Sequence, residues 1–159
     1  MSQRTRAEAT NRKVVASNRK ARHDYHIDET WEAGLVLTGT EIKSVRAGKV
    51  SLKGGFGTIR NGEVWLEGVN IAAYDSGGYV NHDPDRPRKL LMNRREIRRL
   101  IGALEQRGLT LVPLELYLQD GWAKVKVGLG RGKKLHDKRE DIKRRDAARE
   151  AERAMGRRR

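Results

Sequence analysis

The net positive charge of this chain is concentrated at its two ends, and this separation limits which residues can build a core. Residues 1–23 hold seven Lys/Arg against one Asp/Glu, and residues 131–159 hold 13 against six. Residues 24–130 hold 15 against 14, so nearly all of the formal net charge of +14 lies in the two ends. Since such charged ends cannot form a core, roughly 105 residues remain for one small barrel or sandwich.

Two basic segments on either side of a nearly neutral body are typical of a chain that holds a polyanion, although basic tails also serve as solubilising extensions. The sequence has no cysteine, which excludes disulfides and thiolate metal sites and is compatible with a reducing cytosol. Its N-terminal residues are charged but are not followed by the apolar region of a signal peptide, and no apolar run approaches the roughly 18 to 20 residues of a membrane span. We expect a soluble, cytoplasmic, monomeric protein that makes no membrane contact.

Turn residues and alternating apolar residues predict two β-hairpins and a further extended segment. Asn61-Gly62 favours a two-residue turn because both residues tolerate positive φ values, and Asp120-Gly121 takes the same part in the second hairpin. The predicted extended segments are 23–37, 57–60, 63–71, 110–118 and 122–127.

Capping residues predict two short helices. Thr38 or Thr40 can cap a helix of about two turns. Asn93 and Glu96 form a capping box for a second helix, whose apolar residues recur at i, i+3, i+4 and i+7. Between them, residues 73–87 are rich in Gly, Asp, Pro and Asn without any period, which predicts a long exposed loop.

These elements indicate a mostly β protein with helices. The leading candidate is an oligonucleotide-binding-fold-like antiparallel β barrel with flanking short helices and a disordered basic C-terminal tail. Gly54, Gly55 and Gly57 are expected to form a flexible connection into a strand. We divide the chain into a flexible basic arm at residues 1–18, the barrel at 19–130 and the basic tail at 131–159.

The last predicted strand has two distinct faces. A period of two places Trp122, Lys124 and Lys126 on one face and apolar residues on the other. Ammonium groups can neutralise phosphates while an indole stacks on a base or ribose, so the polar face suits nucleic acid. Ordinary solvated lysines on an exposed strand are the alternative.

No catalytic motif is present. Phosphate-binding-loop, H-E-x-x-H and G-x-S-x-G patterns are all absent from the sequence. Asp83 and Asp85 lie beside His82, and such a loop could in principle bind a divalent cation for nuclease chemistry, but Asp-Pro is also a common start of a turn. We therefore predict no enzymatic activity, no metal and no cofactor.

The C-terminal tail has helical propensity but lacks an apolar face. Glu140 with Arg144 and Asp141 with Arg145 are i, i+4 pairs in the favourable orientation. Ile142 and Met155 cannot make a continuous apolar stripe, so nothing in the chain itself is expected to hold this helix. We expect a tail that is disordered in free solution and becomes helical in an anionic RNA channel.

Five stretches, in order and with matching spacing, carry a resemblance to a known family. They are NRKARHDY at 18–25, EAGL at 32–35, GTEIKSVRAGK at 39–49, RKLLMN at 88–93 and KVKVGLGRGKKLHDKR at 124–139. Together they resemble the small protein B family of bacterial proteins that bind transfer-messenger RNA (tmRNA). The resemblance runs from about Asn18 to the C-terminus.

The resemblance implies an oligonucleotide-binding-fold barrel that binds the tRNA-like domain of tmRNA and delivers it to stalled ribosomes for trans-translation. It also implies that the tail enters the empty mRNA channel of the small ribosomal subunit, at the decoding centre, and folds there as a helix. The alternative from the residues alone is a general RNA-binding protein, such as a ribosome-assembly factor or an RNA chaperone.

Matching positions give two sets of candidate site residues. The resemblance, together with the strand pattern for Trp122, implies a tmRNA-binding surface of Asn18, Arg19, Lys20, His23, Glu32, Leu91, Trp122, Lys124 and Lys126. The tail residues implied to contact the ribosome are Lys133, Lys134, His136, Asp137, Lys138 and Arg139. Leu91 would be assigned to the core from pattern alone. Glu32 can accept hydrogen bonds from RNA donors or orient a neighbouring arginine.

Overall fold

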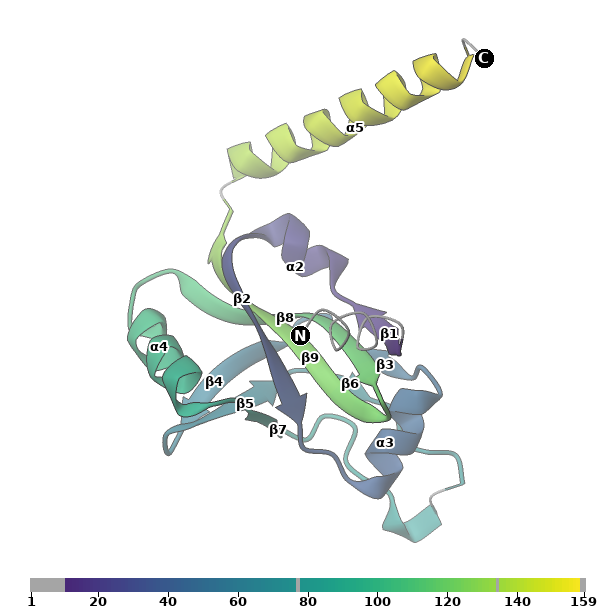
Figure 1. Cartoon of the computed structure of the whole chain (residues 1–159), viewed down its shortest axis with the longest axis vertical. Coiled ribbons are helices and arrows are strands. Elements are labelled where there is room, and N and C mark those ends of the chain that lie inside the picture. Colours follow the sequence, from purple (N-terminus) through teal and green to yellow (C-terminus); the bar gives the residue numbers. More distant parts are fainter. Residues whose placement is uncertain (1–10, 77, 134, 158–159) are drawn as a thin grey trace.

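The computed structural model describes residues 11–157 except for residues 77 and 134, and Figure 1 shows the arrangement of its elements. In chain order these elements are β1 (Arg12–Ser17), α2 (Arg19–Asp24), β2 (Tyr25–Leu35), α3 (Gly39–Arg46), β3 (Val50–Ser51), β4 (Phe56–Arg60), β5 (Glu63–Glu67), β6 (Asn70–Ile71), the 3-10 turn η1 (Gly78–Val80), β7 (Arg88–Leu91), α4 (Arg94–Leu104), β8 (Leu109–Gln119), β9 (Trp122–Gly132) and α5 (Leu135–Arg157).

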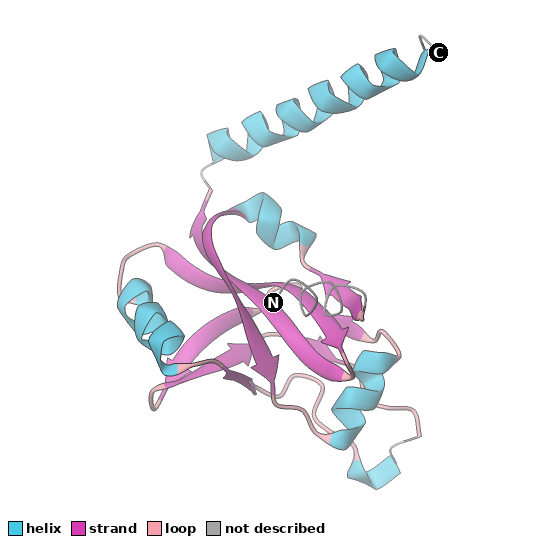
Figure 2. Ribbon diagram, viewed as in Figure 1, coloured by secondary structure: helices cyan, strands magenta, loops and turns pink. Residues whose placement is uncertain are grey.

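Six strands close into an antiparallel barrel, around which the short helices are arranged (Figure 2). The strand order β8-β4-β5-β7-β2-β9 returns to its start because β9 also pairs with β8. The joint between β4 and β8 is short, with Gly57 opposite Leu111. Strand β1 pairs with the second half of β8, on the edge opposite β9 and beyond the contact with β4. The predicted fold class, a mostly antiparallel β barrel with short flanking helices, is confirmed.

Both predicted hairpins are present, and their turns have the expected backbone geometry. The φ values are +50° at Asn61 and +74° at Gly62, and +50° at Asp120 and +82° at Gly121. Positive φ at both central residues matches the right-handed twist of the flanking strands. The second hairpin is longer than predicted, since β9 continues to Gly132, beyond the expected end of the barrel at residue 130.

The capping predictions for the two helices are also confirmed. Thr38, rather than Thr40, caps α3 and forms a capping box with Glu41. Asn93 and Glu96 form the predicted box at the start of α4. These side chains satisfy backbone N–H groups that have no partner within the first helical turn.

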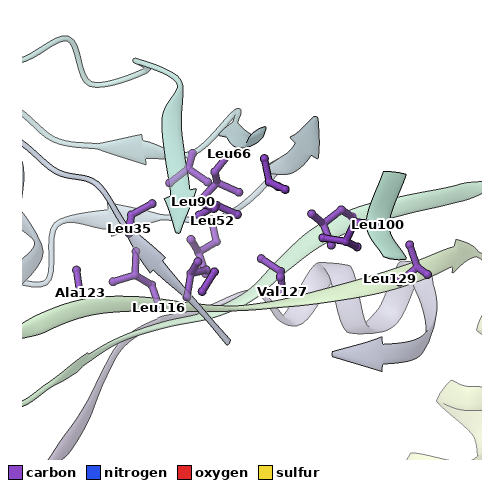
Figure 3. Close-up of a cluster of buried hydrophobic side chains, with 14 of the residues drawn as sticks. Leu35, Leu52, Leu66, Leu90, Leu100, Leu116, Ala123, Val127 and Leu129 are labelled. Atoms are coloured by element: carbon purple, nitrogen blue, oxygen red, sulfur yellow. The ribbon is translucent and has the colours of Figure 1, made fainter. Parts of the chain in front are cut away.

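Apolar side chains from several strands fill the barrel, as Figure 3 shows for Leu35, Leu66, Leu90 and Val127. Leu100 of α4 joins the same cluster and is wholly buried. The alternate residues of β9 face this interior, which confirms the predicted apolar side of that strand.

A buried ion pair ties α3 to the start of β7. Arg88 Nε donates to Glu41 at 2.6 Å, and both side chains are fully buried. Arg88 also donates to the Val69 and Pro84 carbonyl oxygens at 2.7 and 3.0 Å. Burial alone would raise the pKa of Glu41, but hydrogen bonds from Arg86, the Thr38 backbone and Arg88 outweigh it and lower the pKa to about 2.

Two of the three glycines at the entry to β4 mark close packing, so the expectation of a flexible connection is wrong for them. A Cβ on Gly57 would lie 2.4 Å from Leu111 Cδ2, and one on Gly55 would lie 2.8 Å from Pro113 Cγ. The absence of a side chain lets β4 approach β8 at the short joint of the barrel.

The N-terminal segment is more ordered than expected. Residues 1–10 lie outside the described part of the chain, but Arg12–Ser17 form β1 and pair with β8. The expectation of a flexible arm through residue 18 is therefore wrong for this stretch. Local sequence carries no period here, and the order comes from backbone pairing with a strand about 100 residues away.

The structure contains the tail in its helical form, as α5. The helix extends away from the barrel in Figure 1, and its described side chains beyond Asp141 are exposed. This agrees with the lack of an apolar face in the sequence. The expected dependence of the helix on RNA remains a prediction.

Candidate nucleic-acid interface

Helix α2 packs on the outside of the barrel through a small apolar cluster of its own. The cluster consists of Ala21, Tyr25, Ile27, Val112 and Leu114. Two glycines on the outer face of β9 make room for it: a Cβ on Gly128 would lie 2.8 Å from Ile27 Cγ2, and one on Gly130 would lie 2.9 Å from Tyr25 Cβ. The alternating glycines near the end of β9 therefore hold α2 close to the barrel wall.

Asn18 fixes the start of α2 and is buried. Its Oδ1 accepts from the Ala21 backbone N–H at 3.1 Å, which caps the helix. Its Nδ2 donates to the carbonyl oxygens of Leu52 at 3.2 Å and Pro113 at 2.9 Å. Both amide donors are thus used within the protein, so we assign Asn18 a positioning role rather than a direct contact with RNA.

The other predicted residues of α2 are accessible. Arg19 and Lys20 are exposed, and His23 is half-buried with its Nδ1 3.1 Å from Asp24 Oδ1. That hydrogen bond, followed by one from Lys138, lowers the pKa of Asp24. These three predicted residues therefore offer two cations and an imidazole to a ligand.

A groove of about 560 Å³ beside α2 brings in residues that sequence reasoning missed. Lys20 lines it together with Lys53 and Phe56, and Phe56 is 41% exposed. A lone aromatic residue next to glycines was the only local signal. Two ammonium groups beside an exposed ring suit a phosphate and a base or ribose.

Glu32, Lys124 and Lys126 lie together on the outer face of the β2–β9 pair. Glu32 is opposite Lys126 in the register, and Lys124 Nζ donates to Glu32 Oε1 at 2.9 Å. Tyr117 OH also donates to this carboxylate. Partial burial would raise the pKa of Glu32, but the hydrogen bonds from Tyr117 and Lys124 outweigh it and keep the pKa below its ordinary value. Glu32 therefore orients a lysine, Lys124, whereas the sequence suggested that it could orient a neighbouring arginine.

Strand β1 contributes a cation to the same face. The Arg12 guanidinium lies 3.9 Å from the centre of the Tyr117 ring and 2.5 Å from Glu115 Oε1. Burial and the hydrogen bond to Glu32 raise the pKa of Tyr117. The phenol therefore stays protonated and continues to donate to Glu32. Sequence reasoning missed Arg12 because its place depends on the pairing of β1 with β8.

An apolar groove of about 530 Å³ lies at the far end of the β2–β9 face. Leu91 and Trp122 line it with Val36, Ile42 and Lys124. Leu91 is 55% exposed and Trp122 is 75% exposed. The structure therefore places Leu91 at the surface, as the family resemblance implied, and not in the core as the pattern alone suggested. The candidate residues form two groups, one on α2 and one around this groove, with Glu32 and Lys126 between them.

The start of α5 and the residue Lys133 before it contact α2 through an ion pair and a backbone hydrogen bond. Lys138 Nζ lies 3.1 Å from Asp24 Oδ1, and the Lys133 backbone N–H donates to the Asp24 carbonyl oxygen at 2.8 Å. The Lys133 ammonium pairs with Asp141 and lowers the pKa of that carboxyl group. Two predicted ribosome-contacting lysines are thus paired with carboxylates in this structure.

The remaining candidate tail residues are less defined. Arg139 is exposed. His136 and Asp137 belong to α5, but their side chains, like the whole of Lys134, lie outside the described part of the structure.

The two carboxylates of the acidic loop before β7 accept hydrogen bonds from the protein itself. Asp83 Oδ1 accepts from the Asp85 backbone N–H at 3.0 Å, and Asp85 Oδ1 accepts from Asn70 Nδ2 at 3.0 Å. His82 bridges Thr40 and the Ile71 carbonyl oxygen at 2.8 Å each. Across residues 11–157, with the two gaps noted above, no group of three or more His, Asp or Glu residues is placed to hold a metal ion. None of the described helices has the length and apolar character to span a membrane.

The model of the SmpB protein family matches residues 15–157, which include the barrel, α2 and α5. The chain belongs to the SmpB family. An SsrA-binding protein of Roseiflexus castenholzii is 64% identical over 144 residues, which cover 90% of this chain and 91% of the relative. One of Acidothermus cellulolyticus is 58% identical over 152 residues, which cover 96% of each chain.

A solved structure adds a comparison for the SmpB fold. A chain in the structure described as "tmRNA-SmpB: a journey to the center of the bacterial ribosome" has a TM-score of 0.65 and 56% identity to this chain. The match covers 77% of this chain and 85% of that one. Sequence and fold therefore agree on the SmpB family, a family of RNA-binding proteins.

Proposed function

We propose that this protein binds the tRNA-like domain of tmRNA and delivers it to stalled ribosomes for trans-translation, in which incomplete peptides are tagged. Membership of the SmpB family carries this proposal. The relatives are named SsrA-binding proteins, and the solved neighbour is a tmRNA–SmpB assembly on the bacterial ribosome. The chain covers nearly the full length of those relatives, so the proposal concerns the whole protein.

The outer face of the β2–β9 pair, with α2 at one end and the apolar groove at the other, is the proposed RNA-holding surface. Cations on both α2 and β9 suit phosphates, while Trp122 and Leu91 offer apolar contacts to unstacked bases or riboses. Glu32 keeps the Lys124 ammonium in place, and Asn18 keeps α2 in place. This arrangement combines charge with a shaped apolar site, which favours selectivity for one RNA structure over general attraction to phosphate.

The tail is the proposed ribosomal element, which takes up the empty mRNA channel at the decoding centre as a helix. The exposed surface of α5 supports this proposal because it has charge to offer an RNA-lined channel and no apolar face to bury in the barrel. Lys133, Lys138 and Arg139 are the described tail residues proposed to meet ribosomal RNA. Release of Lys138 from Asp24 is then a step on the way to the ribosome.

We further propose that the protein is a cytoplasmic monomer without enzymatic activity. The setting follows from the ribosome, on which the solved SmpB neighbour is bound. The absence of a nuclease site is supported by Asp83 and Asp85, whose carboxylates accept hydrogen bonds from the Asp85 backbone N–H and from Asn70. Replacing both with Asn should leave the protein's action unchanged, and metal-dependent RNA cleavage abolished by that change would contradict the proposal.

The proposed function is tested by binding a labelled tRNA-like domain of tmRNA, with a size-matched ordinary tRNA as control, across a salt series. The full chain is compared with a version that ends at Gly132, where β9 ends. We expect a preference for the tRNA-like domain that survives truncation. Equal affinity for the two RNAs, with a steep salt dependence that is mostly lost on truncation, would instead favour a general RNA-binding protein.

A further inference from the structure

Two cationic helix faces meet between α2 and α5. Arg19, Arg22 and His23 stand at i, i+3 and i+4 on α2, and Asp141, Arg144 and Arg145 have the same spacing on α5. Together with Lys133 these residues line a cleft of about 390 Å³. Since i, i+3 and i+4 share one face of a helix, each helix presents one side to the cleft.

The positive charge in this cleft is largely uncompensated. Five Lys and Arg side chains line it against a single carboxylate, Asp141, which pairs with Lys133. Among the residues that the structure describes, Arg19, Arg22 and Arg145 have no ion-pair partner, and Arg144 reaches Glu140 only at 3.9 Å. Like charges that face each other across a cleft repel, and a bound anion removes that repulsion.

Guanidinium groups favour one class of anion here. The planar fork of arginine matches the paired oxygens of a phosphate, and arginines on two sides can hold one phosphate from both. The α2 wall also belongs to the proposed RNA-holding surface, so a nucleic acid chain that follows α2 passes the mouth of the cleft.

We propose that the cleft between α2 and α5 binds a backbone phosphate of RNA, held by Arg19 and Arg22 on one side and by Arg144 and Arg145 on the other. This inference rests on the proposed function. Its consequence is a link between the two parts of the protein: RNA that bridges both helices stabilises the start of α5. By reciprocity, the ordered start of α5 strengthens RNA binding to the same extent. The barrel still supplies selectivity, and the cleft adds affinity.

The test compares two full-length double variants, each of which removes two positive charges from α5. Arg144→Gln with Arg145→Gln alters the cleft, and Arg149→Gln with Arg153→Gln alters exposed positions beyond it. For each lost phosphate contact, the slope of log affinity against log salt should become shallower by about 0.7 to 0.9. For each such contact, raising the salt from about 50 to about 200 mM should therefore weaken the wild-type protein about threefold more than the variant. With the tRNA-like domain, the control pair should leave the slope unchanged.

Two RNA sources are assayed separately, the labelled tRNA-like domain and isolated small ribosomal subunits. A selective loss with the tRNA-like domain identifies the phosphate as one of tmRNA, and a selective loss with the subunits identifies it as one of ribosomal RNA. Equal behaviour of the cleft and control variants in both assays would overturn the inference. A wild-type protein that does not prefer the tRNA-like domain over ordinary tRNA would count against the proposed function instead.

Hydrogen exchange provides an independent readout on the unaltered protein. The binding assay identifies either the tRNA-like domain or the small subunit as the source of the phosphate. If the cleft holds RNA, binding of that partner should slow the exchange of the backbone amides of residues 139–146. Amides of residues 149–157 serve as the internal comparison when the tRNA-like domain is bound. Unchanged exchange at residues 139–146 with that RNA bound would contradict the coupling.

Discussion

Replacing Asn18 with alanine tests whether this residue acts on RNA directly or through the placement of α2. The structure assigns three hydrogen bonds to the side chain, one that caps α2 and two that satisfy the carbonyl oxygens of Leu52 and Pro113. All three are lost in Asn18→Ala, and the two carbonyl groups remain in a buried site.

The expected magnitude follows from these three bonds. Loss of the cap costs about 1 kcal/mol. Each of the two other bonds contributes roughly 0.5 to 1.5 kcal/mol. We therefore expect the free energy of unfolding to fall by about 2 to 4 kcal/mol, measured by urea denaturation followed by circular dichroism. The dependence on urea should be unchanged, because the same surface is exposed on unfolding.

RNA affinity should fall together with stability, since Arg19, Lys20 and His23 are carried on the helix that Asn18 anchors. Asn70→Ala is the matched control, because it removes an amide whose hydrogen bond to Asp85 is exposed. Its effect on stability should stay within about 0.5 kcal/mol. A variant of Asn18 that keeps wild-type stability and still loses RNA binding would refute the positioning role and establish a direct contact.

Three further predictions concern the core, the barrel joint and the tail. The pKa of Glu41 is lowered from 4.5 to about 2, so its contribution to stability is present above about pH 4.5 and is lost as the pH falls towards 2. Glu41→Gln should remove that part of the acid dependence and destabilise the protein by about 3 kcal/mol at neutral pH; an unchanged acid transition would contradict this. Gly57→Ala should destabilise the protein by about 1 to 3 kcal/mol because the new Cβ meets Leu111, whereas Gly102→Ala adds a Cβ with nothing within 4 Å and should stabilise α4 by about 0.5 to 1 kcal/mol. Thermal denaturation that ranks the two variants in the opposite order would refute the packing argument. Alanine at residues 137–139 should leave the barrel and the affinity for the tRNA-like domain nearly intact while tagging of stalled peptides fails. The barrel is little affected because the Lys138–Asp24 ion pair lost in this variant contributes less than about 1 kcal/mol, and equal loss of RNA binding and tagging would contradict the separation of body and tail.

The sequence by itself determined the features that depend on neighbouring residues. Asn61-Gly62 and Asp120-Gly121 placed both hairpins because few other residues accept positive φ at two successive positions. Asn93 placed one helix start, and Thr38 or Thr40 placed the other to within two residues, because a short side chain can reach backbone N–H groups one turn ahead. Five motifs between residues 18 and 139 together indicated the family and, through the family, the tail's part in its function.

Only the tertiary structure decided which of these residues are available to a partner. Leu91 is exposed because β7 pairs with β2 beside the apolar groove, and Asn18 is buried because two carbonyl groups from distant segments converge on it. Likewise, β1 is ordered through β8, and the cleft between α2 and α5 joins residues more than 100 positions apart. A local pattern fixes backbone conformation, whereas exposure and pairing depend on which distant segments meet, and those contacts exist only in the folded chain.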